Sequence, residues 1–185
     1  MFAAPSTARL SSAAISAPSA FSSPSDLACD VVDGRNDIDR QADTVAAIAA
    51  HDTQLFGGRL FQALAGAGIR TERAIVLAVL PDSSVGVVGA HPDKVKLERL
   101  FVDDSELFNQ FHVIARQNDM VASAEICRRY LQDSYNAQGE GGRLAVWRRY
   151  RALCDQMESM AGRLTLAAGQ LMSGALQFTV TALAQ

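Results

Sequence analysis

The sequence predicts an α+β fold that is mainly α: a helical domain over residues 38–185 with one β-hairpin, an αα-hairpin and a long C-terminal heptad helix. Two observations predict this class. Apolar residues recur every three or four positions over most of the chain, and one short region at about 74–89 is instead rich in β-branched residues. With 185 residues, 49% of them hydrophobic, the chain can bury one domain-sized core.

Residues 1–25 are expected to form a disordered N-terminal tail, because they hold eight Ser, seven Ala and three Pro but only one charged residue, Arg9. Ser and Pro break every apolar run, which argues against a cleaved Sec signal. We therefore expect a cytoplasmic protein, or one exported without a cleaved Sec signal by a type III-like machine. An organelle transit peptide and an untargeted terminus remain open alternatives.

An acidic linker is expected over residues 26–37, where the composition changes abruptly. From 26 to 43, six Asp stand against two Arg, a local net charge of −4. The spacing excludes an EF-hand, because Gly34 directly follows Asp33 and no Glu occupies the twelfth position. We expect a solvated segment that leads into the first helix.

The first half of the helical domain is expected to contain two short helices and the β-hairpin. Apolar spacing predicts the helices at about 38–50 and 54–67, with a glycine pair at 57–58 weakening the start of the second. Two β-rich runs then flank the turn sequence Pro-Asp-Ser-Ser at 81–84, which predicts the β-hairpin at about 74–89.

Further helices are expected from about 92 to 101 and from about 103 to 136. In the second half of the latter helix, the apolar spacing predicts an inward face formed by Met120, Ala124, Cys127 and Leu131. The glycine-rich run at 138–142 then joins this helix to the next as an αα-hairpin.

The strongest pattern follows Gly142, where apolar residues at seven-residue spacing continue to the end of the chain. It predicts one long C-terminal heptad helix with small residues at one core position and large residues at the other, so that a partner helix can approach closely. The expected helix-packing interface consists of Trp147, Tyr150, Met157, Leu164, Ala168, Leu171, Ala175, Phe178 and Ala182.

Residues 164–185 contain no charged side chain, so an exposed helix here would present an apolar surface that is prone to association. Gln and Thr dilute the apolar run, which argues against a membrane-spanning helix. Burial within the chain's own helical bundle and burial in an assembly both remain open. Together with the Ser-rich start, this composition is similar to that of axial subunits and exported proteins of flagellar and type III secretion systems, a resemblance confined to the two ends of the chain.

Two Arg-Arg-Tyr sequences lie about equally far from the glycine-rich run at 138–142. In an antiparallel helical hairpin they lie at one level, so we expect an arginine cluster that binds an anion, an acidic partner or the acidic segment 26–43. The alternative is that these side chains point outward and are solvated. The expected cluster consists of Arg128, Arg129, Arg148, Arg149 and Arg151.

No residue pattern points to catalysis, a cofactor or a metal site. The three His have no ligand spacing, and the glycine-rich runs lack the spacing of a phosphate loop. An odd number of Cys, here three, argues against a disulfide framework, so we expect a reducing compartment by default. The 17 basic residues against 20 acidic ones argue against a nucleic-acid partner.

We therefore expect a non-enzymatic bacterial protein with a structural or protein-interaction role. Its C-terminal helix would pack against partner helices or other copies, and the protein would be an exported or axial component of a secretion or motility assembly. The alternative is a regulatory module that binds an anion or a small ligand through the arginine cluster on the helical hairpin.

Overall fold

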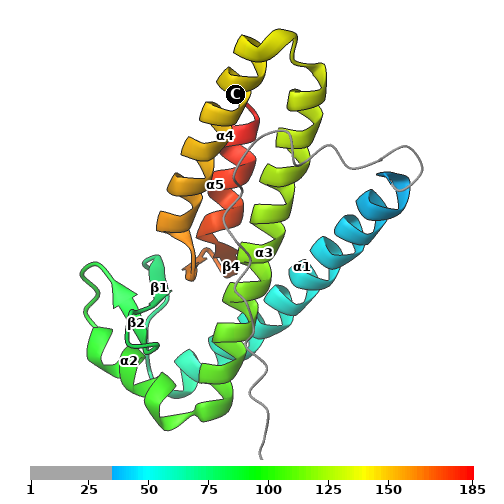
Figure 1. The fold of residues 1–185 in the computed structure, drawn as a ribbon. Helices are drawn as coiled ribbons and strands as arrows, with labels where there is room; N and C mark the ends of the chain where they lie inside the picture. The colour runs from blue at the N-terminus through cyan, green and yellow to red at the C-terminus, as the bar shows by residue number, and fades with distance from the viewer. Residues whose placement is uncertain (1–34) are drawn as a thin grey trace, which may run out of the picture. The chain divides into compact units, whose positions relative to one another are not determined.

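The computed structural model describes residues 35–185, and within them the chain is mainly helical with a small four-stranded antiparallel sheet (Figure 1). The mainly helical α+β class is therefore confirmed. The tail expected over residues 1–25, and all but the last three residues of the linker expected over 26–37, lie outside the described residues.

Helix α1 (Arg35–Gly66) is a single helix, where the sequence predicts two. The glycine pair at 57–58 does not interrupt it. Gly57 instead allows another segment of the chain to pack closely against this helix. A Cβ atom at Gly57 would lie 3.2 Å from the Cβ of Leu171, which is tighter than most real contacts. The missing side chain therefore lets the segment around Leu171 lie close against α1.

The sheet has the strand order β2-β1-β3-β4, with every neighbouring pair antiparallel. Its strands are β1 (Ile75–Val79), β2 (Val85–Val88), β3 (Arg163–Ala167) and β4 (Gln170–Ser173). Leu77 of β1 lies opposite Val87 on one side and Leu164 on the other. Because β1 is an interior strand with neighbours on both sides, its almost wholly apolar sequence suits its place.

The long C-terminal heptad helix predicted from Gly142 onward is wrong. Helix α4 (Gly139–Met160), strands β3 and β4, and helix α5 (Gly174–Leu183) take its place. Two glycines in the left-handed region separate these elements, Gly162 with φ of 69° and Gly169 with φ of 81°. A continuous helix through these residues would require both glycines to leave the left-handed conformation.

Strand β3 buries alternate residues, as a strand in a sheet covered on one face does. Leu164 and Leu166 are buried, while Arg163, Thr165 and Ala167 are half-buried. The Gly162 N–H also donates a 2.8 Å hydrogen bond to the Asp119 carboxylate, which fixes the start of this strand against α3.

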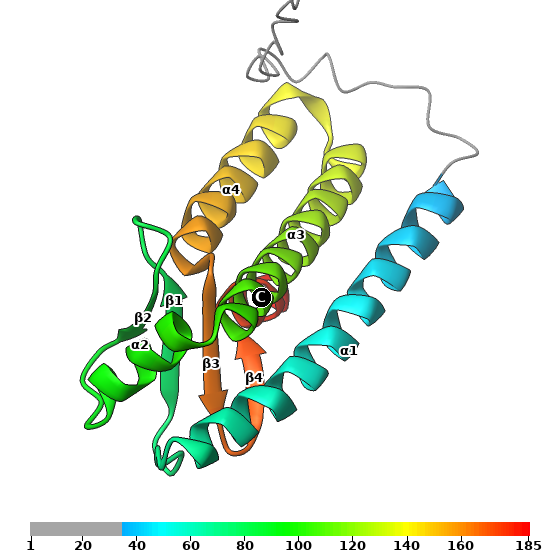
Figure 2. The same cartoon turned by 90° about the horizontal axis from the view of Figure 1, so that it is seen from below.

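Helices α2 (Lys94–Asp103) and α3 (Ser105–Asn136) are separated by Asp104. Its carboxylate accepts hydrogen bonds from the N–H groups of Glu106 and Leu107, at 3.0 and 2.9 Å, and so caps the start of α3. Helices α3 and α4 form an antiparallel pair with α5 packed along both (Figure 1). Helix α1 runs beside α3 on the side away from α4 (Figure 2).

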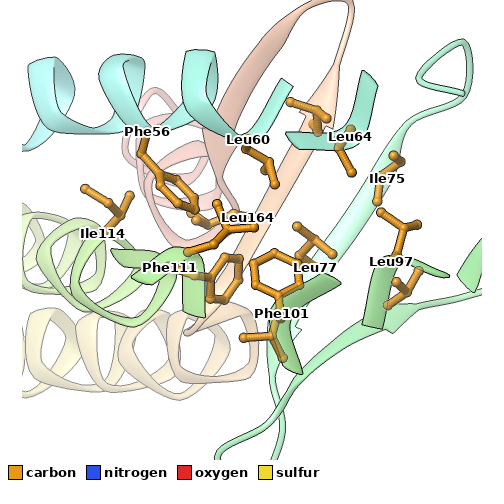
Figure 3. Packing of buried hydrophobic residues seen from close by; sticks show 14 of the residues in the cluster. Phe56, Leu60, Leu64, Ile75, Leu77, Leu97, Phe101, Phe111, Ile114 and Leu164 are labelled. Atoms are coloured by element: carbon orange, nitrogen blue, oxygen red, sulfur yellow. The ribbon is translucent and has the colours of Figure 1, made fainter. Parts of the chain in front are cut away.

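Two apolar clusters hold these elements together. The larger lies between the sheet, α1, α2 and the first half of α3, and Figure 3 shows Phe111 at its centre with the aromatic rings of Phe56 and Phe101 around it. Those rings meet Phe111 edge-on, at centroid distances of 6.3 and 5.5 Å. The smaller cluster joins the second half of α3 to α4 and α5 through Ala122, Ile126, Tyr150, Met157 and Ala175.

Candidate functional site

The facing sides of α3 and α4 are held in register by two tyrosines. The rings of Tyr130 and Tyr150 lie 5.7 Å apart and meet edge-on, and the Tyr150 hydroxyl donates a 2.7 Å hydrogen bond to the Asp133 carboxylate. Burial, and then this hydrogen bond, raise the pKa of Tyr150 to about 12, so the donor keeps its proton at neutral pH. These contacts fix which residues of the two helices lie opposite each other.

The second half of α3 exposes an apolar side. Tyr135 is 77% exposed, Met120 59% and Leu131 46%. The prediction that this side of the helix faces inward is therefore wrong, because the helix buries Ala122 and Ile126 instead. The exposed residues follow one another at spacings of three or four and so share one side of the helix: Met120, Ala124, Cys127, Leu131 and Tyr135.

Helix α4 continues this apolar surface. Leu144 and Trp147 are 44% and 45% exposed and lie one helical turn apart. The register set by the tyrosines places Trp147 at the level of Leu131 and Tyr135. We call the exposed surface formed by Met120, Leu131, Tyr135, Leu144 and Trp147 the hairpin face.

Two of the five predicted cluster arginines lie near Tyr150. Arg129 and Arg149 both influence Tyr150 electrostatically. The guanidinium of Arg149 lies 5.6 Å from the centre of the Tyr150 ring, and its Nη1 is 3.9 Å from the Asp133 carboxylate. Arg129 instead donates a 3.4 Å hydrogen bond to the Glu125 carboxylate, so each of these two arginines has a carboxylate of its own chain beside it.

The other three arginines flank the hairpin face. Arg128 lies one turn before Leu131, Arg148 one turn after Leu144, and Arg151 one turn after Trp147. Two of them pair with carboxylates on their own helices: Glu125 accepts two hydrogen bonds from Arg128, at 2.8 and 2.6 Å, and Asp155 accepts one from Arg151 at 3.1 Å.

The end of the helical hairpin carries a net positive charge. From residue 125 to 155, six Arg stand against four carboxylates, a net charge of +2 in a chain whose total is −3. Arg148 and Arg151 lie at the edge of the hairpin face, where their guanidiniums can meet carboxylates of a partner.

The predicted helix-packing residues lie on four different elements, so they form no common stripe. Only Trp147 belongs to the hairpin face, because Tyr150 and Met157 are buried. The structure places the remaining members on β3 (Leu164), in the β3–β4 turn (Ala168), on β4 (Leu171) and on α5 (Ala175, Phe178 and Ala182).

Sequence reasoning missed Tyr135 and Leu144 altogether. The signal that could have found them is a second apolar spacing in this region, Leu131 to Tyr135 and Leu144 to Trp147, on the two sides of the glycine-rich run.

A cavity of about 460 Å³ lies between the β1–β2 hairpin, α2 and the start of α3. Phe101 and Phe108 line it, together with Glu98, whose carboxylate accepts a 3.1 Å hydrogen bond from the Val87 N–H. None of the arginines in residues 35–185 lines it, and Phe108 is about 30 Å along α3 from Arg128 at 1.5 Å per residue. The cavity and the arginines therefore do not form one ligand site.

Within residues 35–185, no group of three or more His, Cys, Asp or Glu side chains is placed to hold a metal ion. In the same part of the chain, no helix combines the length and the apolar character needed to cross a membrane.

The chain matches no known family model, no curated protein and no solved structure. The function of the hairpin face must therefore be argued from its own residues.

Proposed function

We propose that this chain is a non-enzymatic protein-interaction protein whose hairpin face binds an acidic segment of a partner protein. The observation that supports the proposal most is the exposure of five large apolar side chains along the α3–α4 pair. Trp, Tyr and Arg dominate the energetics of known interfaces, and this surface contains Trp147 and Tyr135, with the exposed Arg148 one turn from Leu144.

The chemistry of the surface defines its partner. Burying the exposed half of each apolar side chain is worth about 1 kcal/mol, so apolar contact alone gives weak association once the cost of docking is subtracted. The flanking arginines add charge-assisted hydrogen bonds and select which segment binds. The partner is thus a helical segment with an apolar stripe flanked by Asp or Glu.

A fluorescently labelled peptide with the sequence of residues 26–43 is a suitable probe, because it has a net charge of −4 and several apolar residues. We expect saturable binding to the full chain, measured by fluorescence anisotropy, and weaker binding as salt is added. Arg148→Glu should weaken binding about tenfold, which corresponds to about 1.4 kcal/mol.

Arg73→Glu is the matched control, since Arg73 is equally exposed but lies in the loop before β1. Equal binding by the two variants, or binding that salt does not weaken, would contradict the proposed site.

We further propose that the protein is exported without a cleaved Sec signal, as part of a bacterial secretion or motility assembly. Only the composition of residues 1–25 supports this, because the C-terminal half of the resemblance assumed a continuous helix. Its test is the N-terminal sequence of the chain recovered from the medium of a secreting strain. A chain that still begins at Met1 fits the proposal, whereas a chain cleaved after an apolar segment, or none in the medium, contradicts it.

A further inference from the structure

Two free thiols lie on the facing helices α3 and α4. Cys127 is exposed and Cys154 is half-buried. Cys127 precedes Tyr130 by three residues and Cys154 follows Tyr150 by four, so each lies one helical turn from a tyrosine of the register pair. Because the helices are antiparallel, each cysteine lies one turn farther from the connecting loop than the tyrosine of its own helix. The two cysteines therefore lie at the same level.

The packing of Cys154 agrees with this placement. Cys154 packs against the apolar cluster that joins α3, α4 and α5 and that contains Tyr130, Ile126 and Tyr150. Burial raises the pKa of the Cys154 thiol, and the nearby charges of Glu158, Asp155 and Cys127 raise it further.

We propose that Cys127 and Cys154 form a reversible intramolecular disulfide that joins α3 to α4 beside the hairpin face. A disulfide needs Cβ atoms about 4 Å apart, so the proposal requires the two side chains to meet between α3 and α4 at this level. The inference does not depend on the proposed function, because it concerns only the chemistry of these two side chains.

Oxidised glutathione is a sufficient oxidant. The Cys127 thiolate attacks one sulfur of the glutathione disulfide, the S–S bond breaks, and one glutathione leaves as a thiolate that takes up a proton. The Cys154 thiol then loses its proton, and its thiolate attacks the Cys127 sulfur, so that the second glutathione leaves. Two protein thiols are oxidised and one glutathione disulfide is reduced to two thiols, so atoms and electrons balance.

The exposures of the two residues set this order. Cys127 is the thiol that a soluble disulfide can reach, and Cys154 is the resolving thiol. Because the pKa of Cys154 is raised, its thiolate fraction at neutral pH is small, and the closing step should accelerate as the pH increases.

The test uses the full chain with Cys29→Ser, which leaves only the two thiols of interest. The folded protein is treated with oxidised glutathione, quenched with acid and analysed by intact mass and tryptic mapping. Trypsin cleaves after Arg128 and Arg151 and so separates the two cysteines. We expect a monomer that has lost two hydrogens, with the two cysteine peptides linked, and closure that is faster at higher pH.

Two variants in the same background test the order of events. Cys154→Ser should accumulate a stable glutathione adduct on Cys127, and Cys127→Ser should react more slowly. Three results would overturn the proposal: a stable adduct on Cys127 with Cys154 intact, a disulfide found only between two molecules, or an oxidised chain that melts at a lower temperature than the reduced one.

Discussion

The turn between β3 and β4 offers a test in which the structure and a continuous helix predict effects of opposite sign. Ala167 pairs with Gln170, so Ala168 and Gly169 form a two-residue loop, and both have positive φ, 49° and 81°. Two-residue hairpin loops with positive φ at both positions favour the sequence Asn-Gly. Ala168→Asn creates that sequence, and because the side chain is exposed, the change removes no packing.

The magnitude follows from the backbone. A left-handed Ala costs about 1–2 kcal/mol relative to Gly, and Asn recovers part of this cost, so Ala168→Asn should stabilise the chain by about 0.5–1 kcal/mol. In a chain of this size that is a rise in melting temperature of about 1–4 °C. Inside a helix the same substitution would instead cost about 0.7 kcal/mol.

Gly169→Ala is the paired variant. A Cβ at this position meets nothing within 4 Å, so only the backbone is affected. The structure predicts a loss of about 1 kcal/mol, whereas a helix would gain about as much. Urea denaturation followed by far-UV circular dichroism measures both variants. If Ala168→Asn destabilises the chain and Gly169→Ala stabilises it, the β3–β4 hairpin is incorrect.

Three further predictions concern buried polar groups. Asn118, 2% exposed, donates 2.8 Å hydrogen bonds to the Thr53 hydroxyl and the Ile114 carbonyl, so Asn118→Ala should lower the free energy of unfolding in urea by about 1–3 kcal/mol; a change within error would contradict this. Burial raises the pKa of Asp119, so the ionised carboxylate lowers the stability of the folded chain. Asp119→Asn should therefore raise the melting temperature at neutral pH, but not at acid pH, where Asp119 is protonated in both the folded and the unfolded chain. A difference in melting temperature that does not depend on pH would contradict this. Tyr150→Phe removes the hydrogen bond to Asp133 and should lower the free energy of unfolding by about 1 kcal/mol. An absorbance titration of the wild type should show one tyrosine ionising near pH 12, and three tyrosines ionising together near pH 10 would refute this.

The helical class could be predicted because apolar spacing is a local property, but the C-terminal fold could not. Leu164 and Leu171 fit a seven-residue repeat, yet Leu164 and Leu166 also fit the alternation of a strand. What decides between them is the pairing of Leu166 with Ile75, more than 80 residues away in the sequence, and no local period reveals it. Gly162 was the available local signal, since its left-handed φ ends the helix.

The candidate site could be predicted only in part. The two Arg-Arg-Tyr sequences correctly drew attention to the end of the hairpin, and there Tyr130 and Tyr150 do meet. The sequence could not show that Asp133 would lie within reach of Arg149, because this contact depends on the register of the two helices. The buried side of α3 continues at three- and four-residue spacings through Asn118, Ala122 and Ile126, so Leu131 is exposed although the apolar spacing predicted it to face inward.

Trp147 allows the most direct test of the proposed interaction, because it is the single tryptophan of the chain and lies in the hairpin face, 45% exposed. The measurement is the Trp147 emission spectrum of the full chain during titration with the peptide of residues 26–43, which contains no tryptophan. Coverage of the hairpin face predicts a saturable shift of the emission to shorter wavelength that Arg148→Glu weakens and added salt reverses. A peptide that binds while the emission of Trp147 stays unchanged would contradict the account.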